Sequence, residues 1–249
     1  DLHSFPTRRS SDLAIHLWSR TNYTLIENAP KNDDGTITLT AGQWYVVSSY
    51  ISVGCFTVTG DGAANIILCD GKNIIIKRIE TDFNSGSLNI YGQGEGTGEF
   101  NVDRSACNVN DKAMSGNLTV YGGRVAIYGN DSGNECSPQY GIVGDVTMYG
   151  GSLTAAGGHD NNVDLAGIFG NVTLSWMNAT DRFYANSIRG TVTVAPGKAF
   201  ADDEGNVYSG SISSGSIAGK TLQPTASVTL PSGITAVSGL LTSGENHYA

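Results

Sequence analysis

The chain has 249 residues, only 15% of them charged, and a net charge of −9. A protein that binds a phosphate polymer clusters its Lys and Arg. Here the basic residues are scattered singly apart from Lys77-Arg78, so we expect neither nucleic acid nor an anionic membrane as a partner. The longest apolar runs are strand-length, far short of the ~20 residues of a membrane helix, which excludes membrane insertion of this segment.

The composition predicts an all-β fold with very little helix. Gly accounts for 33 residues, and Thr, Ser and Asn fill much of the remainder. These residues favour strands and turns over helices. Period-two alternation bounded by glycine recurs along the chain, whereas no long stretch has apolar residues at helical spacing.

Residues 1–13, DLHSFPTRRSSDL, match the in-frame translation of a common sequencing-library adapter. We expect them to be an artefactual tail, the alternative being a natural disordered arm. On the first reading the natural start of the protein is missing. The absence of a visible signal peptide then says nothing about localisation.

The next segment, residues 14–35, is expected to be an N-terminal cap or linker. Several short strands separated by Gly/Asp/Asn turns are predicted after it. They are Thr36–Thr40, Trp44–Val47, Phe56–Thr59, Ile66–Cys69 and Ile74–Ile76.

A six-residue pattern then recurs five times, and such self-similarity indicates a repeat architecture. The copies are GSLNIY, GNLTVY, GDVTMY, GNVTLS and GTVTVA, which begin at Gly86, Gly116, Gly144, Gly170 and Gly190. Positions three and five are apolar in every copy, so alternation points them to a core and positions two, four and six outward. Two copies continue through Gly-Gly into another strand, as expected at a corner.

We therefore predict a right-handed parallel β-helix, or β-solenoid, over residues 36–224. Residues 225–249 resemble the truncated start of a following β module. Exposed strand edges at the ends of a solenoid would have to be covered by caps or by neighbouring modules of the same chain. An antiparallel sandwich is the alternative, although it does not require the same pattern in every copy.

The four cysteines allow three pairings, and none has zinc-site spacing. Cys107 and Cys136 precede successive repeats at similar distances, so they could form a disulfide; two reduced thiols explain them equally well. Three acidic loops invite comparison with calcium sites, but none completes a calcium-loop pattern, so we predict no metal and no cofactor. These loops contain Asp34, Asp160 and Asp202.

The most specific surface feature is a column of tyrosines at repeat position six: Tyr91, Tyr121 and Tyr149, with Tyr128 and Trp176 nearby. Stacked layers lie about 4.8 Å apart, so the rings could form an exposed ladder. Aromatic rings in a row can bind the apolar faces of sugars. The alternative is a ladder that covers the corner glycines and stiffens the layers.

These repeats resemble the glycine-rich β-solenoid regions of large bacterial secreted or surface proteins described as adhesin-like or carbohydrate-binding. The matching stretches include GNLTVYGGRVAIYG and GDVTMYGGSLTAAGG. The resemblance implies an extracellular or cell-surface structural and adhesive segment, with a glycan or another host-surface ligand as candidate partner and without enzymatic activity.

Two alternative functions require sequence features of their own. The first alternative is a polysaccharide lyase or glycoside hydrolase on a parallel β-helix with a divergent site, because the paired carboxylates that such enzymes usually place on one face are not found in the sequence. An ice-binding face needs Thr-x-Thr ladders, of which only Thr191-Val192-Thr193 is present.

Overall fold

A computed structural model describes residues 22–81, 86–102, 112–131, 140–160, 163–176 and 178–225, and three short strands at 234–237, 240–243 and 246–248. These residues form strands and two 3-10 turns, η1 (Ile26–Asn28) and η2 (Ser214–Ser216), without any α-helix. The prediction of an all-β fold with very little helix is confirmed. The adapter-like residues 1–13 lie outside the described residues.

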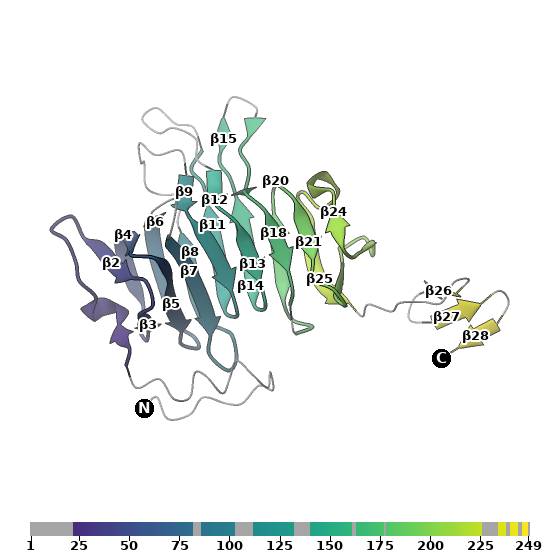
Figure 1. Ribbon diagram of the computed structural model, residues 1–249, viewed down its shortest axis with the longest axis horizontal. Coiled ribbons are helices and arrows are strands. Elements are labelled where there is room, and N and C mark those ends of the chain that lie inside the picture. Colours follow the sequence, from purple (N-terminus) through teal and green to yellow (C-terminus); the bar gives the residue numbers. More distant parts are fainter. Residues whose placement is uncertain are drawn as a thin grey trace.

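Two large sheets make up most of the described chain, and their strands lie side by side along the long axis of the molecule (Figure 1). The first sheet contains, in spatial order, β1 (Thr24–Leu25), β3 (Trp44–Val47), β5 (Gly62–Leu68), β7 (Gly86–Gly92), β10 (Asn117–Val120), β13 (Val146–Met148), β18 (Val172–Leu174), β21 (Val192–Val194) and β24 (Ser211–Ile212).

The second sheet begins with β2 (Thr36–Thr40), β4 (Ile51–Thr59) and the long strand β6 (Asn73–Thr81), where it divides into two arms. The first half of β6 pairs with β8 (Glu99–Val102), and its second half with β9 (Lys112–Ser115). The first arm continues through β11 (Arg124–Tyr128), β14 (Ser152–Ala156) and β19 (Arg182–Ala185). The second arm continues through β12 (Tyr140–Val143), β17 (Ile168–Phe169) and β20 (Ile188–Arg189).

The five repeat copies become five adjacent parallel strands of the first sheet. Leu118 of β10 lies opposite Leu88 of β7 on one side and Val146 of β13 on the other, and β18 and β21 continue this register. After each of the first four copies the chain adds one strand to each arm of the second sheet, as in β10, β11 and β12. We call the parallel-paired strands from β2 to β21 the parallel stack.

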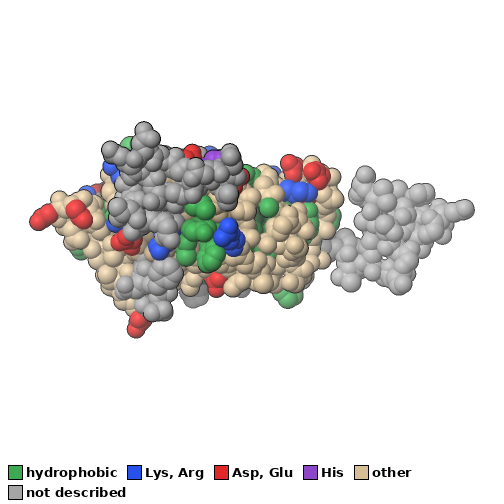
Figure 2. Space-filling model, turned by 90° about the horizontal axis from the view of Figure 1, so that it is seen from above, with side chains coloured by type: hydrophobic (Ala, Val, Ile, Leu, Met, Phe, Trp, Pro, Cys, Tyr) green, Lys and Arg blue, Asp and Glu red, His purple; other side chains and the backbone are tan. Residues whose placement is uncertain are grey.

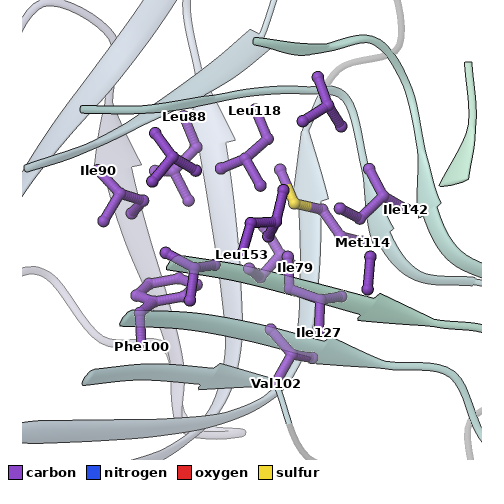
Figure 3. Packing of buried hydrophobic residues seen from close by; sticks show 14 of the residues in the cluster. Ile79, Leu88, Ile90, Phe100, Val102, Met114, Leu118, Ile127, Ile142 and Leu153 are labelled. Carbon is purple, nitrogen blue, oxygen red and sulfur yellow. The ribbon is translucent and has the colours of Figure 1, made fainter. Parts of the chain in front are cut away.

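The apolar positions of the repeat point inward, as the alternation predicts. Position three and position five side chains are almost fully buried in every copy, and they share one core with residues of both arms (Figure 3). The pairs are Leu88/Ile90, Leu118/Val120, Val146/Met148, Val172/Leu174 and Val192/Val194. Phe100, Ile127 and Leu153 meet them from the first arm, and Met114 and Ile142 from the second.

Glycine at position one is required because successive layers approach each other there. A Cβ atom on Gly170 would lie 2.1 Å from the carbonyl oxygen of Gly144, and one on Gly190 would lie 2.1 Å from that of Gly170. The predicted corner glycines Gly123 and Gly151 both adopt a φ of +83°, and a Cβ on Gly151 would also lie 2.5 Å from the Gly123 carbonyl oxygen. Both glycine positions of the repeat therefore follow from backbone geometry.

One corner of the parallel stack carries insertions of variable length. Residues 157–167 between β14 and β17 include the antiparallel hairpin β15 (His159–Asp160) and β16 (Val163–Asp164). In the next layer only Asn186 and Ser187 separate β19 from β20. This difference is the main reason why the last two copies, at Gly170 and Gly190, are the closest together in the sequence.

Parallel pairing stops after β21, and residues 199–225 form what we call the antiparallel end. It consists of β22 (Ala199–Ala201), β23 (Val207–Tyr208), β24 and β25 (Thr221–Thr225). Strand β24 is antiparallel to β21, and β25 is antiparallel to both β19 and β22. The buried side chains of the antiparallel end, Phe200, Ile217 and Leu222, belong to the core of the parallel stack. The predicted segment 36–224 thus contains two kinds of pairing.

A separate antiparallel sheet is formed by β26 (Ile234–Val237), β27 (Leu240–Ser243) and β28 (Asn246–Tyr248), within the segment predicted to begin another module. In the predicted N-terminal cap, the described residues include Ile26, which is fully buried in the core.

Candidate ligand-binding face

The outer face of the first sheet carries the tyrosine column, formed by Tyr91, Tyr121 and Tyr149. The rings of Tyr91 and Tyr121 stack with centroids 4.6 Å apart and planes 2° apart, and those of Tyr121 and Tyr149 stack at 5.0 Å and 11°. The predicted ladder is therefore present. Tyr91 lies near the end of β7, and Tyr121 and Tyr149 directly follow β10 and β13, so the register of the parallel strands sets the ring spacing.

Trp44 extends the tyrosine column at its N-terminal end. Its ring lies 5.0 Å from that of Tyr91 with the planes tilted by 37°. Below these two rings, Val46, Ile67 and Cys69 form a small buried apolar cluster outside the main core. The sequence pattern did not reveal Trp44, because this residue precedes the repeats. The available signal was its position two residues before Val46 in an alternating strand, which places both side chains on the same face.

The stacking covers most of the ring faces within the tyrosine column. Tyr121 lies between two rings, so its faces are occupied by Tyr91 and Tyr149. Burial, and then the neighbouring Tyr149, raise the pKa of the Tyr121 phenol, while a hydrogen bond with Tyr91 opposes them. Tyr149 is 37% exposed, whereas Tyr91 and Tyr121 are only partly exposed. A ligand therefore meets ring edges and hydroxyls along the column, and more ring surface at Tyr149.

A column of threonines runs beside the tyrosines at repeat position four. Thr119, Thr147, Thr173 and Thr193 occupy equivalent places on β10, β13, β18 and β21. They are intermediate in exposure except Thr193, which is exposed. The threonine hydroxyls and the tyrosine edges thus form parallel rows with the spacing of the layers.

Repeat position two forms a hydrogen-bonded ladder on the same face. The side-chain oxygen of Asn117 accepts the Asp145 backbone N–H at 2.8 Å, and Asp145 accepts that of Asn171 at 2.7 Å. Asn171 accepts the Thr191 N–H at 3.1 Å and its hydroxyl at 2.7 Å. This arrangement explains the Asn or Asp at this position, since each acceptor ties one layer to the next.

The structure does not bring Tyr128 and Trp176 to this face. Tyr128 ends β11 in the first arm of the second sheet, on a different side of the parallel stack. Trp176 is 2% exposed, packs edge-on against Phe200 at 5.0 Å and donates its indole N–H to the Ala199 carbonyl at 3.3 Å. The placement of Trp176 near an exposed column is corrected, because its apolar ring fills the core beside the antiparallel end.

A second exposed aromatic group lies on the second arm. Phe169 is 44% exposed and contacts the ring of Tyr140 at 5.5 Å, and the Arg189 guanidinium lies 5.8 Å from the centre of the Tyr140 ring. Seen from above, the molecule displays a hydrophobic patch with Lys or Arg beside it (Figure 2). In this view the charged side chains form small separate groups and no extended basic stripe.

The acidic loops are occupied by hydrogen bonds and ion pairs. The Asp34 carboxylate accepts the Thr36 N–H at 2.9 Å, and Asp164 contacts His159 Nδ1 at 2.7 Å. Asp202 has a fully buried side chain, and the Lys220 ammonium contacts it at 2.8 Å and Glu204 at 2.9 Å. Among the described residues, no group of three or more His, Cys, Asp or Glu side chains could hold a metal ion.

The environment of Asp202 shifts two pKa values. Burial by itself would raise the Asp202 pKa, but hydrogen bonds from Lys220, Asn206 and Tyr208 outweigh burial and hold it well below 3.8. The hydrogen bond to Asp202, and then that to Glu204, raise the Lys220 pKa above its usual 10.5. The pair is therefore fully ionised at neutral pH and fastens the antiparallel end.

Two other carboxylates near corners accept backbone N–H groups. Asp70 accepts those of Glu95 and Thr97 at 2.9 and 3.1 Å, and Asp181 accepts those of Gly151 and Asn178 at 2.8 and 2.9 Å. Both therefore organise the loops around them.

Cys107 and Cys136, the predicted disulfide pair, lie outside the described residues. The other two cysteines, Cys55 and Cys69, are buried free thiols. Burial is the largest cause that raises the pKa of both.

Comparison with known proteins gives no match: no family model fits the chain, and neither the curated proteins nor the solved structures contain a significantly similar one. In the described part of the chain, no helix is long and apolar enough to span a membrane.

Proposed function

We propose that the chain is a non-enzymatic segment of a bacterial surface or secreted protein, built as a right-handed parallel β-helix, that acts as a scaffold and presents a glycan-binding face. The β-helix interpretation is supported by the chain's repeated passage through one strand of the first sheet and one strand of each arm. Successive layers of the parallel stack are in register, as a solenoid requires.

The observation that carries the binding proposal is the stacked tyrosine column beside the threonine column. Sugars are bound through an apolar face that contacts an aromatic group and through hydroxyls that need hydrogen-bond partners. The outer face of the first sheet offers ring edges, phenol groups and Thr147 and Thr173 in adjacent rows. The net charge of −9 favours a neutral glycan over an acidic one.

The extracellular placement rests on the resemblance of the repeats to those of adhesin-like proteins. Other modules of the same chain, and a glycan or another ligand on a host surface, are the partners that this reading implies. The scaffold role comes from the stack itself, since added layers lengthen the molecule without changing its cross-section.

The test is a glycan array with the full 249-residue chain, with release of reducing ends measured on the same glycans. We expect binding without release, and loss of binding in the Tyr91→Ala/Tyr121→Ala/Tyr149→Ala variant. A Thr147→Val/Thr173→Val variant removes hydroxyls with little change in shape and should weaken binding without unfolding the protein. Tyr50→Ala and Phe169→Ala are controls, because both side chains are exposed elsewhere.

Two outcomes would contradict the proposal. Absence of binding to every glycan would leave a scaffold without a sugar site. Release of reducing ends would instead indicate a polysaccharide lyase or a glycoside hydrolase.

A further inference from the structure

The tyrosine column ends at Tyr149, although the backbone that carries it continues without a break. The N–H groups of Tyr121 and Tyr149 donate to Ile90 and Val120 at 2.8 and 2.7 Å. The next two residues at position six keep this pattern: Ser175 donates to Met148 at 2.7 Å, and Ala195 donates to Leu174 at 2.8 Å. Ser175 therefore stands where the register would place a fourth ring.

The two ends of the tyrosine column differ in how they are covered. At the N-terminal end the ring of Trp44 covers Tyr91. At the C-terminal end the described residues give Tyr149 a single ring contact, with Tyr121. The residues in line with Tyr149 beyond this point, Ser175 and Ala195, have short side chains that cannot cover a phenol ring. Within the described part of the chain, one face of Tyr149 is therefore left without an aromatic neighbour.

The place above Ser175, in line with the tyrosine column, has the dimensions and the chemistry of a sugar subsite. A ring above Ser175 would lie about 4.8 Å from that of Tyr149, the distance between layers. The apolar face of a pyranose can occupy that place, since it packs on an aromatic ring in the same way. The Ser175 hydroxyl lies at its base, and Thr173 is on the same outward face two residues earlier along the strand. Both groups can donate to and accept from sugar hydroxyls.

We propose that one neutral pyranose residue binds on the open face of Tyr149, in the place that a fourth tyrosine would take above Ser175. This inference rests on the proposed glycan-binding function and assigns the position of the sugar. It also gives the two tyrosines different roles: Tyr149 offers a ring face to the sugar, whereas both ring faces of Tyr121 are occupied.

The test fills the site without removing any aromatic residue. Ser175→Tyr should extend the tyrosine column by one ring and occupy the subsite, whereas Ser175→Ala leaves the space open. We expect Ser175→Tyr to weaken sugar binding about tenfold or more, since one stacked contact is lost. Ser175→Ala should change binding by about threefold or less, since one hydrogen bond to an exposed hydroxyl is lost.

Binding is measured by saturation-transfer NMR with the full chain, using the best array glycan and the methyl β-glycosides of glucose, galactose and N-acetylglucosamine. Thermal melting of each variant shows whether it folds, and Ser175→Leu fills the same space if Ser175→Tyr does not. Saturation should be transferred to the protons of the apolar sugar face in the original protein. It should disappear in the filled variants.

The possible outcomes separate this inference from the broader function. If Ser175→Tyr binds as well as the original protein while the triple tyrosine variant does not, the glycan lies along the ring edges; the subsite is then wrong and the function stands. If the original protein binds no sugar, both are wrong. If p-cresol, used as an aromatic probe, displaces the sugar and binds more tightly, the ligand class is wrong.

Discussion

The parallel stack and the antiparallel end share one core but are held together differently. In the parallel stack the same contacts recur between successive layers: a glycine close to a glycine, an Asn or Asp oxygen that accepts the next N–H and, in three layers, a ring on a ring. In the antiparallel end Lys220, Asn206 and Tyr208 converge on the buried carboxylate of Asp202. Those contacts occur once.

The difference follows from what each region must satisfy. Inside a stack, the layers on both sides supply partners for every backbone group, so a short repeated pattern is sufficient. At the last layer one partner is missing, and unpaired strand edges would be exposed. Strand reversal in β24 and β25 supplies the partners, and the Asp202 network fixes that reversal.

The largest expected effect comes from a methyl group between two layers of the parallel stack. Gly170→Ala would put a Cβ atom 2.1 Å from the Gly144 carbonyl oxygen, so the layers must separate. We expect a loss of about 3 kcal/mol or more in the free energy of unfolding, measured by urea denaturation.

Gly54→Ala is the matched control for Gly170→Ala. It also lies in the parallel stack, but its Cβ would be 3.7 Å from the nearest atom, the Asp34 carbonyl oxygen. Its expected change is within about 0.5 kcal/mol. Equal losses in the two variants would show that the close approach of the layers is not what selects glycine.

The second effect concerns the antiparallel end and depends on pH. The Asp202 pKa is lower in the folded state than its usual 3.8, so its contribution is complete above that value and is lost as the pH falls toward the folded-state pKa. The Lys220 pKa is raised above 10.5, so its contribution is complete below that value and is lost as the pH rises through the folded-state pKa. Asp202→Asn should lower the melting temperature at neutral pH and flatten its decline in acid.

Asp203→Asn controls for the loss of one negative charge in the same loop, because Asp203 is exposed. Melting curves from about pH 2 to pH 7 would compare the variants. If Asp203→Asn flattened the acid decline as much as Asp202→Asn, net charge rather than the buried pair would explain it.

A third effect tests whether the tyrosine column stabilises the parallel stack as well as binding a ligand. Tyr121→Ala removes a ring stacked on both sides, and we expect a loss of about 2 kcal/mol. Tyr50→Ala, at a residue 67% exposed, should be close to neutral. Thermal and urea denaturation measure both, and a neutral Tyr121→Ala would mean that stacking adds nothing to stability.

The smallest effect compares two asparagines that both begin an Asn-x-Thr triplet, Asn171 at repeat position two and Asn178 in a loop. Asn171→Ala removes the acceptor of the Thr191 N–H and should cost about 1 kcal/mol. Asn178→Ala changes an exposed loop residue of a similar triplet and should be nearly neutral. Urea denaturation measures the free energy of unfolding of both variants. Equal losses would show that the hydrogen-bonded ladder does not explain the Asn or Asp at repeat position two.

The sequence alone determined the strand class, the direction of the repeat side chains and the spacing of the tyrosine column. These features are local or periodic: alternation fixes which side chains of GNLTVY point inward, and equal register places Tyr91, Tyr121 and Tyr149 in line. Tertiary structure decided the features that depend on residues distant in the sequence. It placed Trp176 in the core because Phe200 covers it, joined Trp44 to Tyr91, and brought Lys220 to Asp202. No periodic pattern encodes such contacts, since each arises once, where the fold brings two unrelated segments together.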